Sequence, residues 1–238
     1  MSGRPAPVTR WWWVRHAPVN SGGRIYGAAD VDADCSDPSL FRGLAARLPE
    51  PAIWVTSHLR RTHQTAEAIF EQRGDGAARP SLQQDPELGE QSFGDWQGLT
   101  YAECEESRGK GMETFWLAPA EETPPNGESF AALVERVSAA IRRLTEQHRG
   151  ADIVAVTHGG TIRAALSLAL KLPPAQVLAF SIDNCSLTRI DHIPSEHEPG
   201  GEAWRVAGVN VRPEIGIRER LGFVLRRRGL RPRARVPG

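Results

Sequence analysis

Residues 152–160 read Asp-Ile-Val-Ala-Val-Thr-His-Gly-Gly and give the clearest indication of the fold class. The run from Asp152 to Thr157 is almost continuously apolar and β-branched, which is typical of a strand covered on both faces. The two glycines lead directly into a helical pattern over residues 161–171. A buried strand followed at once by a helix is the repeating unit of a parallel α/β sheet.

The same alternation continues along the chain in both directions. Short apolar runs at residues 11–14 and 53–57 predict two more strands, and residues 62–72 read as a helix directly after the second. A longer helix is predicted before Gly150, because apolar residues recur there at steps of three and four: Phe130, Leu133, Val134, Val137, Ile141 and Leu144. Late strands are expected over residues 178–182, 186–191 and 204–209. The pattern predicts an α/β fold, a three-layer sandwich with a mostly parallel central sheet and helices on both faces.

Length and composition are consistent with one sizeable domain. The chain has 238 residues, of which 40% are hydrophobic and 24% charged, close to the average for globular proteins. No stretch of eighteen apolar residues predicts a membrane span, and the first seven residues lack the apolar core of a secretory signal. Three scattered cysteines (Cys35, Cys104 and Cys185) argue against a disulfide framework and a structural zinc site. We therefore expect a cytoplasmic protein.

The net charge of zero hides an uneven distribution. Nine arginines and two glutamates lie between Arg212 and Gly238, which leaves 20 basic and 27 acidic residues in the rest of the chain. We expect residues 1–9 to be a flexible N-terminal segment, 10–212 the folded domain and 213–238 a basic C-terminal extension. The extension is more often a solvated end. A contact with nucleic acid, an anionic membrane surface or an acidic partner is the alternative.

Polar residues follow three of the predicted strands at the point where each strand ends. Arg15-His16 follows the first strand, Ser57 to Thr62 the second, and His158-Gly159-Gly160 the strand at residues 152–157. Because ligands bind beyond the carboxyl ends of parallel strands, we expect these segments to meet at one edge of the sheet. Two histidines and at least two arginines would converge there, which predicts a phosphate site with a nucleophile inside it.

Each residue type suits phosphate ester chemistry. Guanidinium groups hold two phosphate oxygens at once, and neutral imidazole can form a covalent phosphoryl intermediate. Backbone amides at Gly159 and the helix start would add further donors. A leaving alkoxide needs a proton, and Glu90, in a segment rich in glycine and aromatic residues (88–98), is the candidate acid. Two histidines with a glutamate could instead hold a metal, but neighbouring arginines oppose a cation, so no metal or cofactor is predicted.

The order of these motifs resembles that of the histidine phosphatase superfamily, which has the phosphoglycerate mutase-like fold. The matching segments span roughly residues 10–209 and are residues 14–16 (Val-Arg-His), 57–65 (Ser-His-Leu-Arg-Arg-Thr-His-Gln-Thr), 90–98, 125–129 (Pro-Asn-Gly-Glu-Ser), 158–160 and 184–188. Within that family, the compact form is similar to the phosphatase branch that includes α-ribazole phosphatases.

The resemblance implies a role for each candidate residue. His16 would be the phosphorylated nucleophile and Glu90 the proton donor and later base. Arg15 and Arg61 would clamp the phosphate, and His158 would complete the pocket. Arg61, and not Arg60, lies in the register set by Gln64-Thr65.

One departure from the family pattern concerns the loop after the first motif. Ala17 stands where the family has glycine, and Pro18-Val19 where Glu-Thr often follows. Asn20 lies two residues closer to His16 than the family's asparagine, and it reaches the phosphate if the loop carries a two-residue deletion.

The sequence thus favours a metal-independent phosphomonoesterase that acts on small phosphorylated metabolites through a phosphohistidine at His16. A phosphoglycerate mutase-type transferase is disfavoured because residues 96–128 are too short for the insertion that closes a mutase site. A protein phosphohistidine phosphatase stays open as an alternative. The non-enzyme alternative is a phosphate or nucleic-acid binding module that uses the arginine-rich tail. The sequence leaves the oligomeric state open, with a dimer among the options.

Overall fold

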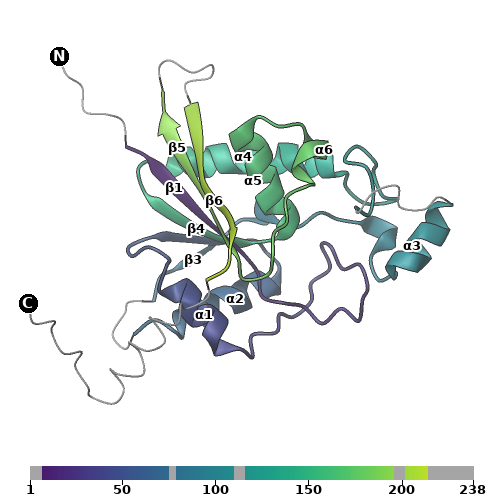
Figure 1. Ribbon diagram of the computed structural model, residues 1–238, viewed down its shortest axis with the longest axis horizontal. Helices are drawn as coiled ribbons and strands as arrows, with labels where there is room; N and C mark the ends of the chain where they lie inside the picture. Colours follow the sequence, from purple (N-terminus) through teal and green to yellow (C-terminus); the bar gives the residue numbers. More distant parts are fainter. Residues whose placement is uncertain (1–6, 75–78, 110–115, 196–201, 214–238) are drawn as a thin grey trace, which may run out of the picture.

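The computed structural model describes residues 7–74, 79–109, 116–195 and 202–213. A six-stranded sheet runs through its centre in the order β3-β2-β4-β1-β5-β6 (Figure 1). The strands are β1 (Thr9–Arg15), β2 (Ile53–Thr56), β3 (Leu82–Gln84), β4 (Asp152–Thr157), β5 (Leu187–Pro194) and β6 (Glu202–Val211). The pairs β1–β4, β2–β4 and β2–β3 are parallel, whereas β5 runs antiparallel to both of its neighbours. The sheet is therefore mixed, with only β5 reversed.

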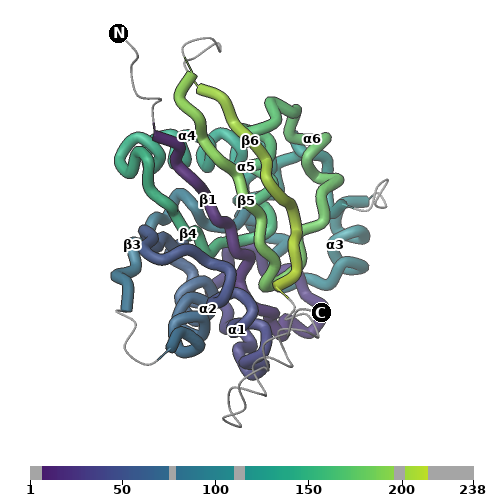
Figure 2. The backbone as a smooth tube through the Cα atoms, turned by 60° about the vertical axis from the view of Figure 1, so that its left-hand side comes forward, coloured from purple at the N-terminus to yellow at the C-terminus, as the bar shows by residue number. Residues whose placement is uncertain are grey.

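Helices cover both faces of the sheet, so the predicted three-layer α/β fold is confirmed. The helices are α1 (Pro38–Ala45), α2 (Arg60–Phe70), α3 (Tyr101–Arg108), α4 (Phe130–Gln147), α5 (Gly159–Leu170) and α6 (Pro174–Val177), with 3₁₀ turns η1 (Pro86–Leu88) and η2 (Gly94–Trp96). Figure 2 shows α1 and α2 on one side of the sheet and α4, α5 and α6 on the other. The first side packs Phe41, Leu44 and Trp54, and the second packs the apolar face of α4.

The tryptophan side chains of β1 alternate between the two faces of the sheet and pack against both helix layers. Trp11 and Trp13 are buried on the α4 side and stack with ring centroids 4.8 Å apart. Trp12 points to the opposite face, where its indole Nε1 donates to Asp152 Oδ1 at 2.8 Å. These indoles therefore pack the domain, as expected for a strand covered on both faces.

Two helix starts lie earlier than the sequence predicts. Helix α2 begins at Arg60 and helix α5 at Gly159, each directly after a strand-end turn. The shift places Arg61 in the first turn of α2 and Gly159 and Gly160 in the first turn of α5. The structure also contains α1, β3 and α3, for which the sequence analysis made no prediction.

The predicted strand over residues 178–182 is wrong. This segment follows the short helix α6, which begins after Pro173, and it continues as irregular backbone. Its carbonyl groups are used differently from those of a strand: Phe180 O accepts from Arg163 Nε, and Ile182 O accepts from Arg15 Nη1. Leu178 and Ile182 of the run are buried in the core beside α4 and α5, and Phe180 is partly buried there, which explains why the composition resembles that of a strand.

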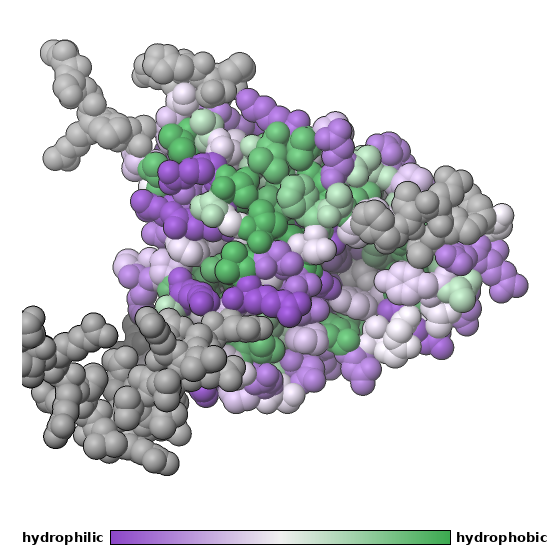
Figure 3. All heavy atoms as spheres, viewed as in Figure 1, coloured by the Kyte–Doolittle hydropathy of each residue, from purple (hydrophilic) through white to green (hydrophobic). Residues whose placement is uncertain are grey.

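The predicted domain limits are compatible with the described part of the chain but are not tested by it. Regular structure runs from Thr9 in β1 to Val211 in β6. Residues 1–6 and 214–238, which include most of the predicted terminal segments, lie outside the described residues. Across the described ranges, no helix is long and apolar enough to cross a membrane. Figure 3 shows hydrophobic side chains gathered over the region of β6, α5 and α6 on one face.

Candidate active site

The carboxyl ends of three neighbouring strands meet at one place, as predicted. Strand β4 lies between β1 and β2, so the residues that follow these strands become neighbours. The amide of His16 donates to the carbonyl of Thr157 at 2.8 Å, and the rings of His16 and His158 lie 5.2 Å apart between centroids. Two imidazoles that are 142 positions apart in the chain therefore share one pocket.

His16 is buried and held in one tautomer. Its Nδ1 lies 2.7 Å from the carbonyl oxygen of Ala17. Because a carbonyl can only accept, Nδ1 carries the proton and Nε2 keeps its lone pair. Burial lowers the pKa of His16 to about 3, with the positive charges of Arg61 and Arg15 acting in the same direction and the Ala17 hydrogen bond opposing them. The ring is therefore neutral at physiological pH, and Nε2 is available as a nucleophile.

The backbone around His16 is fixed by two side chains from distant elements. Thr65 Oγ1 in α2 accepts from the amide of Ala17 at 2.8 Å. Asn184 Nδ2, just before β5, donates to the carbonyl of His16 at 2.8 Å. These contacts hold the strand end at which the imidazole projects.

His158 is completely buried, and its two ring nitrogens have different surroundings. Nε2 lies 2.8 Å from Ser57 Oγ, whereas Nδ1 has no partner among the described residues. Burial holds the pKa of His158 well below its usual value, and His16 and Arg61 act in the same direction. A neutral ring carries one proton, so the Ser57 contact decides which nitrogen can donate to a ligand.

The hydrogen bonds around Ser57 favour a proton on Nδ1 of His158. Thr62 Oγ1 donates to the carbonyl of Leu59 at 2.8 Å, and Ser57 Oγ accepts from the Leu59 amide at 3.1 Å. Ser57 Oγ also lies 3.3 Å from Thr62 Oγ1, but its contact with His158 Nε2 is shorter, at 2.8 Å, so we place the Ser57 hydroxyl proton on the line to His158 Nε2. With Nε2 as acceptor, the ring proton lies on Nδ1, the nitrogen without a protein partner.

Arg61 is the buried member of the Arg60-Arg61 pair, in agreement with the register that the sequence indicated. Its Nη1 donates to Ala29 O at 2.7 Å and its Nη2 to Gly27 O at 2.6 Å. Arg60 is exposed and pairs with Asp30 and Asp32. Burial lowers the pKa of Arg61, while the charge of Glu90 opposes this shift.

Arg15 and Arg61 both keep buried N–H donors that are available to an anion. Arg15 Nη1 donates to Ile182 O at 2.5 Å, and the Nε atoms of both arginines are buried without a hydrogen bond within the described ranges. A buried guanidinium donor without an acceptor is costly unless a ligand supplies the acceptor. The pocket therefore contains unpaired donors on Arg15, Arg61 and His158, which suits a phosphate group.

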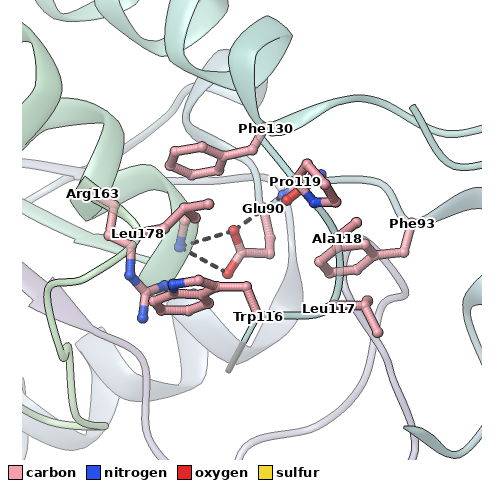
Figure 4. Close-up of a pocket in the computed structure, with 11 residues that line it drawn as sticks. Glu90, Phe93, Trp116, Leu117, Ala118, Pro119, Phe130, Arg163 and Leu178 are labelled. Atoms are coloured by element: carbon pink, nitrogen blue, oxygen red, sulfur yellow. Dashed lines mark hydrogen bonds between the residues drawn. The ribbon is translucent and has the colours of Figure 1, made fainter. Parts of the chain in front are cut away.

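Glu90 contacts the first turn of α5, the helix that directly follows His158. Its Oε1 and Oε2 accept from the amide of Gly160 at 3.1 and 3.3 Å, as Figure 4 shows. A Cβ at position 160 would lie only 2.3 Å from Glu90 Oε1 and 2.9 Å from Leu133 Cδ2, so a larger residue there would displace the Glu90 carboxylate from this position.

The loop that carries Glu90 is braced from α4. Arg136 forms an ion pair with Glu128 at 2.8 Å, and its Nη1 also donates to Glu87 O at 2.6 Å. The turn at Gly94 packs closely against the backbone of the turn at residues 125–127, because a Cβ at Gly94 would lie 2.0 Å from Pro125 O. These contacts explain the density of glycine that the sequence shows in this segment.

One predicted contact has no support in the geometry. Asn20 is exposed, and within the described part of the chain it makes no hydrogen bond to the cluster. Its contact with phosphate stays a prediction.

Several side chains of the site were missed by the sequence analysis. Tyr26 lies against Arg61, with the guanidinium carbon 5.2 Å from the ring centroid. Arg163 in α5 and Trp116 line a cavity beside Glu90. Of these, only Arg163 carries a sequence signal, because it follows the His158 motif at a spacing that keeps it near the start of α5.

The remaining histidines were not predicted as site residues, and of these His58 lies near enough to His158 to act on it electrostatically. His58 is exposed and His63, His148 and His192 are partly buried, while His197 lies outside the described residues. Across residues 7–74, 79–109, 116–195 and 202–213, no three His, Cys, Asp or Glu side chains are grouped as a metal site requires. The three cysteines are free.

The family model of the histidine phosphatase superfamily (branch 1) matches residues 11–205. The chain therefore belongs to this superfamily, and it is a phosphatase of the histidine phosphatase type.

Three similar proteins illustrate the range of its relatives. A glucosyl-3-phosphoglycerate phosphatase of Mycolicibacterium vanbaalenii is 30% identical over 87% of this chain and 97% of its own. A metal-independent phosphoserine phosphatase of Arabidopsis thaliana is 30% identical over 66% of this chain and 67% of its own. The crystal structure of the α-ribazole phosphatase of Shigella flexneri shares the fold, with a TM-score of 0.68, 23% identity, and coverage of 87% of this chain and 98% of that one.

Proposed function

We propose that this protein hydrolyses phosphomonoesters of small metabolites through a phosphohistidine intermediate on His16. The observation that carries the proposal is the state of His16, a buried neutral imidazole with its proton on Nδ1. Unpaired donors of Arg15, Arg61 and His158 surround it. An electron pair on Nε2 next to three donors is the arrangement that attack on a phosphate needs.

The first half of the reaction transfers the phosphoryl group to the enzyme. Nε2 of His16 attacks phosphorus while the bond from phosphorus to the ester oxygen breaks. Arg15, Arg61 and the Nδ1–H of His158 stabilise the charge on the phosphoryl oxygens, and the amide of Gly159 lies in the same first turn of α5. Glu90, in its protonated form, gives its proton to the leaving alkoxide.

The second half regenerates the enzyme. A water molecule attacks phosphorus, Glu90 accepts a proton from that water, and the bond between phosphorus and Nε2 breaks. Inorganic phosphate leaves, and His16 and Glu90 return to their starting protonation states. Two cavities flank Glu90 and share Phe93, Trp116 and Leu117 in their walls, which leaves space for the leaving group and then for water.

Relatives support a small-metabolite substrate. The names of two of them contain phosphoglycerate and phosphoserine, both small phosphomonoesters. A protein phosphohistidine substrate is the second candidate that the sequence left open, but no feature of the described structure favours it.

The proposal is tested by kinetics and by trapping. We expect His16→Ala to lower kcat/KM for p-nitrophenyl phosphate by roughly 10³-fold or more, because the nucleophile is lost. A chelator should leave the parental rate unchanged, and a rapid quench in alkaline detergent with labelled substrate should give an alkali-stable, acid-labile phosphoenzyme. His148→Ala, at the end of α4, is the matched control and should keep parental activity. Equal rates for His16→Ala and the parent would refute the proposal.

A further inference from the structure

A partly buried cation lies on the leaving-group side of the site. Arg163 projects from α5 into the cavity that Glu90 also lines (Figure 4). The other walls are mainly apolar and include Trp116, Phe130 and Leu178. A guanidinium group in such surroundings is expensive to desolvate without an anionic partner.

The known contacts of Arg163 leave much of its guanidinium unused. Nε donates to Phe180 O at 2.9 Å, and the guanidinium carbon lies 4.5 Å from the centroid of the Trp116 ring. Among the described residues, no carboxylate lies within 4 Å of its nitrogens, and neither Nη atom makes a hydrogen bond. Burial lowers the pKa of Arg163 to about 10, although the charge of Glu90 opposes this shift.

Other arginines nearby are paired with carboxylates. Arg108 binds Glu122 at 2.8 Å, and Arg136 binds Glu128 at 2.8 Å. Both of these pairs brace loops. Arg163 is instead held by the Phe180 carbonyl and the Trp116 ring, which orient its guanidinium at the wall of the cavity.

Arg163 also lies close to the phosphate-binding arginine. A Cβ at Gly159 would lie 3.4 Å from Arg163 Nη1 and 3.6 Å from Arg15 Nε, so the two guanidinium groups flank the same point of the α5 start. A ligand that engages both must carry its two anionic groups only a few bonds apart. The second group must be small, because Glu90 and Gly160 line the same cavity as Arg163.

Charge balance selects the type of anion. One guanidinium compensates one negative charge, and its paired Nη–H groups match the two oxygens of a carboxylate. A second phosphate dianion would leave an uncompensated charge beside the carboxylate of Glu90. The apolar walls would strengthen a one-to-one ion pair by excluding water.

We propose that Arg163 binds a carboxylate on the leaving group, so that the preferred substrates are phosphomonoesters of small hydroxy acids. This inference rests on the proposed phosphatase function and specifies its substrate class. Arg163 is then a specificity-determining residue, with Trp116 holding its guanidinium in place by stacking.

Matched substrate pairs test the inference. Phosphoserine and O-phosphoethanolamine differ only in the carboxylate, and 3-phosphoglycerate and glycerol 3-phosphate differ by a carboxylate in place of a hydroxymethyl group. For the parent protein we expect kcat/KM to be at least about tenfold higher for the carboxylated member of each pair, mainly through a lower KM. For Arg163→Gln we expect this ratio to fall close to one, and for Arg163→Lys to an intermediate value.

A control variant separates local from general effects. Arg142→Gln removes an exposed arginine of α4 that pairs with Glu202, and it should keep the parental ratio. Circular dichroism of each variant shows that the comparison is made on folded protein. A parental ratio near one, or an Arg163→Gln variant that keeps the parental ratio, would overturn the inference.

Binding of non-hydrolysable phosphonates distinguishes failure of this inference from failure of the proposed function. By calorimetry, the parent should bind 2-amino-4-phosphonobutyrate at least about tenfold more tightly than 3-aminopropylphosphonate, and Arg163→Gln should lose that preference. Hydrolysis of p-nitrophenyl phosphate without any carboxylate preference would refute only the carboxylate site. Carboxylate-dependent phosphonate binding without hydrolysis of any ester would support the site and refute the phosphatase proposal.

Discussion

The state of His16 predicts that the domain loses stability in mild acid. His16 has an unfolded pKa near 6.5 and a folded pKa of about 3. Between these values the unfolded chain binds a proton that the folded protein excludes, so lowering the pH favours unfolding. The contribution of His16 to stability is fully present above pH 6.5 and is lost as the pH falls toward 3.

The size of the effect follows from these two values. Between pH 7 and pH 5, the linkage relation gives a loss of about 2 kcal/mol in the free energy of unfolding from His16 alone. His16→Gln removes this titration, while an amide at the same position can still donate to the Ala17 carbonyl. We therefore expect the parent to lose about 2 kcal/mol more than His16→Gln over this interval.

Urea unfolding at pH 7 and pH 5 measures the difference. Buffers without phosphate are needed, because an anion that binds the folded state would itself stabilise it. His148→Gln, which removes a histidine outside the cluster, should keep the parental loss of stability. If the parent and His16→Gln lose the same free energy between the two pH values, the buried neutral state of His16 is refuted.

Three further changes probe other parts of the site. Ser57→Ala should lower kcat about tenfold or more and move the His158 proton from Nδ1 toward Nε2. The tautomer is measured by ¹⁵N NMR of the His158 ring, and an unchanged tautomer would show that Ser57 is only structural. Glu90→Gln should slow alkyl phosphate hydrolysis about 10²-fold or more but p-nitrophenyl phosphate much less, since p-nitrophenolate leaves without a proton; equal losses would contradict a role as acid. Gly160→Ala should lower both kcat and the melting temperature, because its Cβ meets the Glu90 carboxylate, and parental values for both would refute that close approach.

The sequence predicted the central features of the fold because those features depend on local patterns. The spacing of apolar residues predicts the strand at residues 152–157 and the amphipathic face of α4, and the structure has both. The choice of Arg61 over Arg60 followed from motif register, and the structure buries Arg61. Residues 178–182 show the limit of this reasoning, because a buried irregular segment and a buried strand have the same composition.

The side chains that support the site could not be predicted in the same way. Asn184 holds the carbonyl of His16 from 168 positions away, and Ser57 reaches His158 across 101 positions. Neither contact can be predicted from the spacing of residues in the sequence, since each depends on the order of separate strands in the sheet. Arg163 lies on a predicted helix, yet its lack of a carboxylate partner within the described residues appears only when the cavity walls are assembled.

The alternation of strands and helices and the types of residue at the strand ends follow from local sequence patterns, because hydrophobic periodicity and turn chemistry act over a few residues. The protonation states of His16 and His158 and the unpaired donors of Arg15 and Arg61 arise in the folded molecule. Those properties depend on burial and on neighbours brought together by the strand order β2-β4-β1. The free energy of a charge depends on its surroundings, and these exist only in the folded chain.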